Sequence, residues 1–362
     1  MYYVGLDVHQ KRSSLCILDG DGKLVKRLEV KGPWPKLIEA VDLHVPRPFA
    51  VCYEASCGYG PLHDRLRAAG RAERVAVAHP GQVRLIFRSK RKHDRVDAER
   101  LAKLLYLGEV PQVHVPGVDV RAWRGLINYR RKLVGRRAAA KTQVRALLRG
   151  LGVVEGVPRG LWTAKGLAWL KDLALASAAD RVRRDVMLDD LDELGERVAK
   201  VEAELDRIAK GHPGVALLRT IPGVGPRTAE AFVAHVDDVG RFARVKQVGC
   251  YFGLVPCQDA SADRNRLGHI TKDGPAGARW LLAEAAWQGR RRSPTVRAFF
   301  ERVMRDDGDR KKVALVATAH YLARVMAAML RSGEAWREDP KASEQQQQQQ
   351  QPTTTTTTTT NR

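Results

Sequence analysis

The chain has 362 residues, with 63 lysines and arginines against 41 aspartates and glutamates, so its formal net charge is +22. A positive charge of this size favours a polyanionic partner, chiefly nucleic acid, because the neutralisation of phosphates releases counterions. No run approaches the roughly 20 uninterrupted apolar residues of a membrane span, and the N-terminus lacks the basic and apolar regions of a signal peptide. We therefore expect a cytoplasmic, nucleoid-associated protein that is not bound to a membrane.

The first 110 residues show the pattern of an α/β domain. Apolar alternation predicts strands over 4–8, 14–18 and 24–30, with a hairpin turn at 19–22 between the second and third. Two further buried strands are expected over 49–53 and 74–78, separated by a helix over 61–69 and followed by a helix from Asp94 to about Leu107. This order matches a ribonuclease-H-like (RuvC-like) sheet.

A long basic helix is expected over 121–149, with ten basic and no acidic residues. Ten like charges repel one another unless a polyanion compensates them, which favours nucleic-acid contact over a simply solvated face. The candidate nucleic-acid-binding residues on this helix are Arg130, Arg131, Arg136, Arg137 and Lys141.

A second long helix is predicted over roughly 179–210. Its apolar residues follow the heptad a/d spacing, which fits either an intramolecular helical hairpin or a self-associating coiled coil. These residues are Leu191, Leu194, Val198, Val201, Leu205 and Ile208.

A mostly helical domain is expected from 212 to about 337, with a short extended patch near 250–255. Seven glutamines and eight threonines follow, a composition that cannot bury a core and predicts disorder. The expected organisation is a catalytic domain over 1–118, the basic helix and heptad segment over 119–211, a C-terminal domain over 212–337 and a disordered tail over 338–362.

The five cysteines include no Cys-x-x-Cys pair and lie within apolar runs, which predicts reduced core thiols rather than metal ligands or disulfides. They are Cys16, Cys52, Cys57, Cys250 and Cys257.

Four carboxylates fall at positions that suggest chemistry. Asp7 lies at the end of the first predicted strand and Glu54 follows the fourth, and these two strands are neighbours in a ribonuclease-H-like sheet. Asp94 and Asp97 are three residues apart at the start of a helix, on one face. Asp94 could instead be an N-cap, Asp97 a first-turn acid and Asp7 a turn residue. Converging carboxylates would bind Mg²⁺, and two such ions suit phosphodiester chemistry.

A proline- and glycine-framed turn at 217–229 has the pattern of a helix–hairpin–helix. Gly223 and Gly225 would let backbone N–H groups approach a phosphate without a side-chain clash. An ordinary helical hairpin with glycine caps is the alternative. Two more basic clusters, 290–292 and 310–312, fit either a solvated surface or phosphate contact.

Together these motifs resemble the Asp-Glu-Asp-Asp transposases of the insertion sequence one-ten family. The resemblance rests on Gly-Leu-Asp-Val at 5–8, on Glu54 after a strand, and on Asp-x-x-Asp-Ala at 94–98. A C-terminal segment, 253–274, also resembles the transposase domain of that family. The resemblance places Ser261 where members carry a serine that attacks DNA, and Arg264, Arg266 and Lys272 lie close to it in sequence.

The resemblance implies a transposase, a DNA recombinase that excises and inserts its own mobile element. Members are guided by a structured non-coding RNA, assemble as dimers and tetramers, and combine the carboxylates of one subunit with the serine of another. On that basis Asp7, Glu54, Asp94 and Asp97 would hold Mg²⁺ while Ser261 attacks. The alternatives are a junction resolvase or nuclease that uses activated water, and a catalytically inactive nucleic-acid-binding relative.

Overall fold

The computed structural model describes residues 1–56, 58–68, 71–87, 94–261 and 264–342, without the side chains of 94–95, 260–261 and 264–265. The chain divides into two compact units, Met1–Arg121 and Ala122–Arg362. Each unit is described below by itself.

The N-terminal unit is built on a five-stranded sheet of order β3-β2-β1-β4-β5. The first three strands are antiparallel neighbours, while β1, β4 and β5 run parallel. This arrangement is consistent with the expected ribonuclease-H-like sheet, and it makes the first and fourth strands neighbours. The strands are β1 (Tyr2–Val8), β2 (Arg12–Leu18), β3 (Leu24–Lys31), β4 (Phe49–Glu54) and β5 (Arg74–Ala78).

Helices cover both faces of this sheet. Helices α1 (Trp34–His44) and α2 (Tyr59–Arg67) contribute Leu37 and Leu62 to one apolar cluster with the strands. On the other face, α4 (Asp94–Leu107) packs Leu101, Leu104 and Leu105 against β4 and β5. Helix α3 (Pro80–Ile86) follows β5. The helix predicted to begin at Asp94 is confirmed.

Gly5 brings α4 close to the central strand. A Cβ atom at this position of β1 would overlap the backbone carbonyl of Ala98 and crowd the amide of Ala102, both in α4. Ala98 and Ala102 are themselves small and buried, beside Cys16 and Leu18 of β2. Small residues on both elements therefore set how closely the helix that carries Asp97 lies to the strand that carries Asp7.

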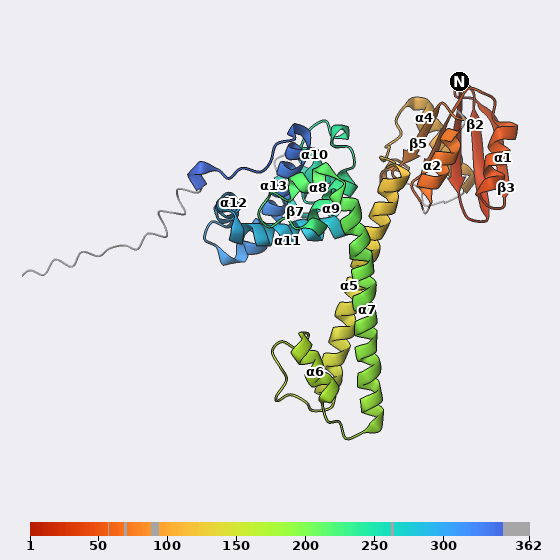
Figure 1. Ribbon diagram of the computed structural model, residues 1–362. Coiled ribbons are helices and arrows are strands. Elements are labelled where there is room, and N and C mark those ends of the chain that lie inside the picture. The colour runs from red at the N-terminus through yellow and green to blue at the C-terminus, as the bar shows by residue number, and fades with distance from the viewer. Residues whose placement is uncertain (57, 69–70, 88–93, 262–263, 343–362) are drawn as a thin grey trace, which may run out of the picture. The chain divides into compact units, whose positions relative to one another are not determined.

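Two long helices dominate the start of the second unit. Helix α5 (Val118–Gly150) runs beside α7 (Ala178–Lys210), and α6 (Ala164–Asp172) packs near the far end of the pair (Figure 1). Leu133 of α5 packs against Leu194 and Val198 of α7. These heptad residues therefore pack against another helix of the same chain, as in an intramolecular helical hairpin.

Helices also form most of the rest of the unit, around α13 (Lys311–Ser332), together with one two-stranded hairpin. The prediction of an extended segment near 250–255 is wrong, because Lys246–Tyr251 is helical and the strands begin at Pro256. Between them Gly253 turns the chain with φ +62°. The other elements are α8 (Pro213–Leu218), α9 (Pro226–Val236), α10 (Lys246–Tyr251), β6 (Pro256–Ser261), β7 (Arg264–Ile270), α11 (Ala276–Arg292) and α12 (Pro294–Met304), with 3₁₀ turns at Val239–Arg241 and Gly308–Arg310.

In the described part of the chain, one helical segment, Gly308–Ser332, is long and apolar enough to pass a simple test for a membrane span. Leu322, Ala323 and Met326 from this segment are fully buried in the core of the second unit. Apolar composition is what a core helix requires, so the segment is weak evidence for a membrane.

Two expectations about the chain need correction. Cys16 and Cys52 are buried as predicted, but Cys250 and Cys257 are exposed, because α10 and β6 turn them out of the core; Cys57 lies outside the described residues. The segment expected to be disordered from 338 begins with ordered residues. Glu338 accepts a hydrogen bond from the Ser293 hydroxyl at 2.8 Å, and the amide of Asp339 donates to the Thr295 hydroxyl.

Glu230 of α9 is a buried carboxyl. It is 0% exposed, and Nη1 of Arg227 lies 3.2 Å from its Oε2. Burial raises the pKa of Glu230 from 4.5 to about 7, an effect that the charge of Arg227 partly offsets. The folded protein therefore holds this proton more tightly than the unfolded chain does. It follows that Glu230 lowers stability progressively as the pH rises from 4.5 to about 7.

Replacing Glu230 with Gln is expected to remove this pH dependence. Relative to the wild type, the variant should gain stability between about pH 5 and about pH 8, by up to roughly 3 kcal/mol, since one pKa unit corresponds to about 1.4 kcal/mol. Urea unfolding at the two pH values measures the gain. Burial also lowers the pKa of His235 to about 4, which makes the wild type more stable as pH rises, so the variant must be compared with the wild type at each pH. A difference in the free energy of unfolding between variant and wild type that does not change with pH would contradict the prediction.

Candidate active site

Two of the predicted carboxylates lie at the carboxyl ends of neighbouring parallel strands. Leu6 of β1 is in register with Tyr53 of β4, so the next residues along the two strands are Asp7 and Glu54. Parallel pairing places these strand ends at the same edge of the sheet. Both residues follow the buried apolar part of their strand and are themselves half-buried.

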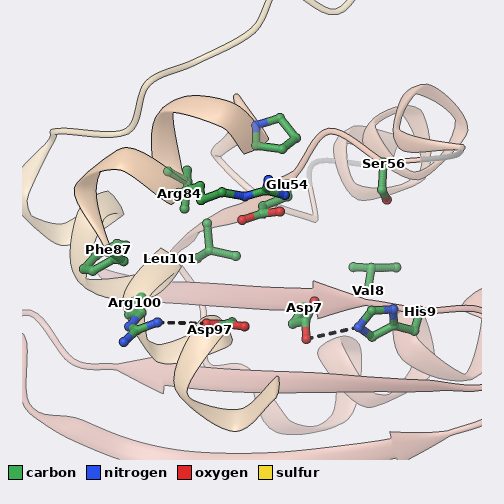
Figure 2. A pocket seen from close by; sticks show the side chains of 12 residues that line it. Asp7, Val8, His9, Glu54, Ser56, Arg84, Phe87, Asp97, Arg100 and Leu101 are labelled. Carbon is green, nitrogen blue, oxygen red and sulfur yellow. Dashed lines mark hydrogen bonds and ion pairs between the residues drawn. The ribbon is translucent and has the colours of Figure 1, made fainter. Parts of the chain in front are cut away.

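A pocket of about 400 Å³ brings three of the four predicted carboxylates together: Asp7, Glu54 and Asp97 line it. They come from β1, β4 and α4, and the close approach of α4 at Gly5 is what allows Asp97 to join the other two. Figure 2 shows these side chains around the pocket. Asp94 is the first residue of α4, and its side chain lies outside the described part of the structure.

Basic side chains accompany these carboxylates. Nε2 of His9 lies 3.3 Å from Oδ2 of Asp7, and Nη1 of Arg100 donates to Oδ1 of Asp97 at 3.1 Å; Figure 2 marks both contacts. Arg84 also lines the pocket. Within the described residues, no three His, Cys, Asp or Glu side chains form a group that could hold a metal ion. These contacts direct Asp7 toward the imidazole of His9 and Asp97 toward the guanidinium of Arg100.

The pocket nevertheless suits a divalent cation by its chemistry. Its three carboxylates supply the oxygen ligands that Mg²⁺ prefers, and they stand on a strand end, a neighbouring strand end and a helix rather than on one loop. These three are the described carboxylates whose donor chemistry matches Mg²⁺, although in this structure they do not form a ready metal-binding group.

Sequence reasoning did not single out His9, Arg84, Arg100 or Ser56, all of which line the pocket. A signal for Arg100 was present, because it follows Asp97 by three residues on a helix, a spacing at which opposite charges meet. His9 follows Asp7 by two residues just beyond the strand. Arg84 and Ser56 reach the pocket only through the packing of α3 and of the loop after β4.

Ser261 lies in the second unit, at the end of an antiparallel hairpin. It is the last residue of β6 and is in register with Arg264, the first residue of β7. The side chains of Ser261 and Arg264 are outside the described part. The other predicted basic residues of this region, Arg266 and Lys272, are exposed, and Lys272 has a left-handed backbone with φ +58°.

The basic helix is partly neutralised within the chain, which corrects the expectation that a polyanion must compensate all ten charges. Nε of Arg130 donates to Oε1 of Glu202 in α7 at 2.8 Å, and the guanidinium of Arg124 donates to the carbonyls of Ala234 and His235. Nζ of Lys141 lies 5.2 Å from the ring centre of Trp162. Arg130 thus acts as a helix-pairing residue, whereas Arg131 and Arg136 are exposed and Arg137 is half-buried.

The predicted glycine turn joins α8 to α9. Gly223 has φ +96°, and a Cβ atom there would overlap the backbone of Gly289 in α11, so this glycine serves helix packing. Gly225 is exposed at the N-cap of α9 with open space around its Cα. Of the two glycines, only Gly225 therefore has open space around its Cα.

Comparison with known proteins agrees with these motifs in both units. A family of DEDD transposases of the IS110 type matches residues 4–152, and the Transposase IS116/IS110/IS902 family matches residues 215–301. The first match spans Asp7, Glu54 and Asp97, and the second spans Ser261.

Relatives with the same description span most of the chain. The chain is 30% identical over 296 residues to a Sinorhizobium fredii protein named as transposase y4qE. The match covers 79% of this chain and 71% of that protein. It is 28% identical over 349 residues to the transposase for insertion sequence element IS1111A of Coxiella burnetii, covering 92% and 91%. It is also 27% identical over 244 residues to the transposase for insertion sequence element IS1328 of Yersinia enterocolitica, covering 66% and 70%. On this evidence the chain belongs to the IS110 family of transposases.

Proposed function

We propose that this transposase cleaves and rejoins DNA strands in a divalent-metal-dependent reaction, with the carboxylate pocket at the scissile phosphate and Ser261 as the nucleophile. The observation that carries the proposal is the pocket itself: Asp7, Glu54 and Asp97 come from β1, β4 and α4 and line one cavity of about 400 Å³. Three carboxylates facing a phosphate without a cation would repel it, so the arrangement favours a site that uses Mg²⁺.

In this proposal Asp7, Glu54 and Asp97, with Asp94 from the start of α4, are the residues that would hold Mg²⁺. When bound, the ion would supply Lewis-acid polarisation of the phosphate oxygens. Arg84 and Arg100 line the same pocket and provide further positive charge for the phosphate.

The covalent step is a transesterification. The Ser261 hydroxyl oxygen forms a bond to phosphorus while one P–O ester bond of the DNA strand breaks; the hydroxyl loses its proton, and the departing oxygen gains one. The reverse reaction with another strand end restores the serine and rejoins the DNA. Arg264, in register with Ser261, with Arg266 and Lys272, would stabilise the charge that develops on the phosphate oxygens.

The partners follow from the same proposal. Element ends and target DNA are the substrates, and Arg131, Arg136, Arg137, Lys141 and Gly225 are the residues we propose for backbone contact. A structured non-coding guide RNA and a homodimer or homotetramer stay predictions from the family resemblance.

A covalent-adduct assay tests the proposal. The protein is incubated with Mg²⁺, end-labelled DNA from the element ends and RNA transcribed from the flanks of the element, then denatured and separated by size. We expect a labelled protein–DNA adduct with the wild type and none with Ser261→Ala. Ser332→Ala, the same change at an exposed serine in the last turn of α13, is the matched control and should keep the adduct.

Two results would contradict the serine mechanism. DNA cleavage that survives Ser261→Ala would indicate attack by activated water, as in a junction resolvase or nuclease. Binding without cleavage in the presence of either Mg²⁺ or Mn²⁺ would indicate an inactive nucleic-acid-binding relative.

A further inference from the structure

A basic pocket lies where α11 ends and α12 begins, in the second unit. It has a volume of about 400 Å³ and is lined by Arg290, Arg291, Arg297, Phe300 and Glu301. Three guanidinium groups therefore share the pocket with one carboxylate. None of these residues belongs to the proposed active site.

Arg297 of α12 links the start of that helix to the end of α11. Its Nε donates to the carbonyl of Arg290 at 3.1 Å, and its Nη2 donates to the carbonyl of Arg291 at 3.3 Å. These carbonyls belong to the last turn of α11, where the helix dipole favours a positive charge. Arg297 is thus occupied by the fold, and it fixes the backbone from which Arg290 and Arg291 extend.

Three cations surround a single indole ring beside this pocket. Arg290 lies 4.2 Å from the ring centre of Trp287, Lys311 lies 5.3 Å from it, and Arg291 lies 5.5 Å from it. Attraction to the ring offsets only part of the repulsion between three like charges. Among the described residues, the salt bridges include no carboxylate partner for these three side chains. An anion is the partner that would relieve this repulsion.

Arg290 carries a second sign of a missing ligand. Its Nε is buried and, within the described chain, has no hydrogen-bond partner, although its guanidinium also lies over the Phe300 ring at 4.9 Å. A buried donor left without a partner costs free energy. A guanidinium presents a planar fork of donors that matches two oxygens of a phosphate.

We propose that this basic pocket is a phosphate-binding site for a nucleic-acid strand. Arg290 and Arg291 contact one phosphate, and Lys311 contacts the same phosphate or an adjacent one. Exposed Arg292 and Lys312 extend the positive charge beyond the pocket, which suits a polymer with regularly spaced charges rather than a single small anion. Glu301 limits the affinity of the site by repelling the same phosphate.

Salt-dependent binding of the full chain tests this site. Fluorescence anisotropy is measured in EDTA with three labelled probes of one sequence, about 20 nucleotides long: single-stranded DNA, single-stranded RNA and duplex DNA. Arg291→Gln and Lys311→Gln, both at exposed positions, should each reduce the slope of log K against log salt by about 0.7 for a single strand or about 0.9 for a duplex. At about 0.1 M salt this corresponds to roughly five- to eight-fold weaker binding.

Two further variants sharpen the test. Glu301→Gln should strengthen binding several-fold, because it removes the one carboxylate that lines the pocket. Arg302→Gln makes the same charge change as Arg291→Gln at an exposed position on α12, where the guanidinium lies over Phe299 instead of Trp287. This control should keep the slope and affinity of the wild type.

The possible outcomes distinguish an RNA site from a DNA site, and both from the absence of a site. Weakening confined to the RNA probe assigns the site to RNA, and weakening confined to either DNA probe assigns it to DNA. Unchanged binding of all three probes to Arg291→Gln and Lys311→Gln, or an equal loss with Arg302→Gln, would overturn the proposal. Because binding is measured without divalent metal, the result is independent of whether Ser261 forms an adduct.

Discussion

Asp7→Asn is expected to abolish DNA cleavage while leaving the fold intact. Asp7 is the penultimate residue of the central strand of the sheet and lines the carboxylate pocket. In the proposed mechanism its loss would remove a ligand from a cation that supplies several kcal/mol of transition-state stabilisation. At about 1.4 kcal/mol per factor of ten, the rate should fall by about 10³-fold or more. Single-turnover cleavage of element-end DNA at saturating Mg²⁺ measures the loss.

The control for Asp7→Asn is Asp21→Asn, which makes the same change at an exposed position of the β2–β3 turn in the same unit. It should cleave at the rate of the wild type. Glu54→Gln and Asp97→Asn should reproduce the effect of Asp7→Asn, since all three carboxylates line one pocket. Cleavage within about ten-fold of the wild type in any of the three would show that the carboxylate is not a ligand in the reaction.

Gly5→Ala is expected to disrupt both stability and cleavage, although Gly5 does not line the pocket. The added Cβ would overlap the carbonyl of Ala98, so β1 and α4 must move apart. Overpacking of this kind costs about 1–3 kcal/mol and occasionally more. The same movement would displace Asp97 from Asp7 and Glu54. We expect a lower midpoint in urea unfolding and a fall in single-turnover cleavage of about 10²-fold, which a misplacement of about 1 Å can produce.

Gly20→Ala provides the matched comparison for Gly5→Ala. A Cβ atom at Gly20 would lie 3.7 Å from the carbonyl oxygen of Met1, which is ordinary van der Waals contact. This variant should unfold and cleave as the wild type does. If Gly5→Ala were as stable and as active as Gly20→Ala, the close approach of α4 to β1 would not be what positions the carboxylates.

Much of the N-terminal fold was predictable from sequence because its signals are local. Alternating apolar residues marked the first three strands, short apolar runs marked β4 and β5, and the turn at 19–22 marked the hairpin between β2 and β3. The long helices α5 and α7 were predictable for a similar reason, since apolar residues recur at helical spacing over about nine turns each. The region around 250–255 was not, because an apolar run this short fits a helix and a strand equally well.

From the sequence came the excess of positive charge and the candidate carboxylates at the ends of strands and at the start of a helix, while the family resemblance added the serine and its basic neighbours as candidates. The contacts that these charged groups make became visible in the folded chain. It paired Asp7 with His9 and Asp97 with Arg100, and it matched Arg130 with Glu202, 72 residues away. It packed Gly223 against α11 and gathered three cations around Trp287. The reason is physical: residue type and spacing set what a side chain can bind, whereas its actual partner depends on which groups the packing of distant elements brings within a few ångströms.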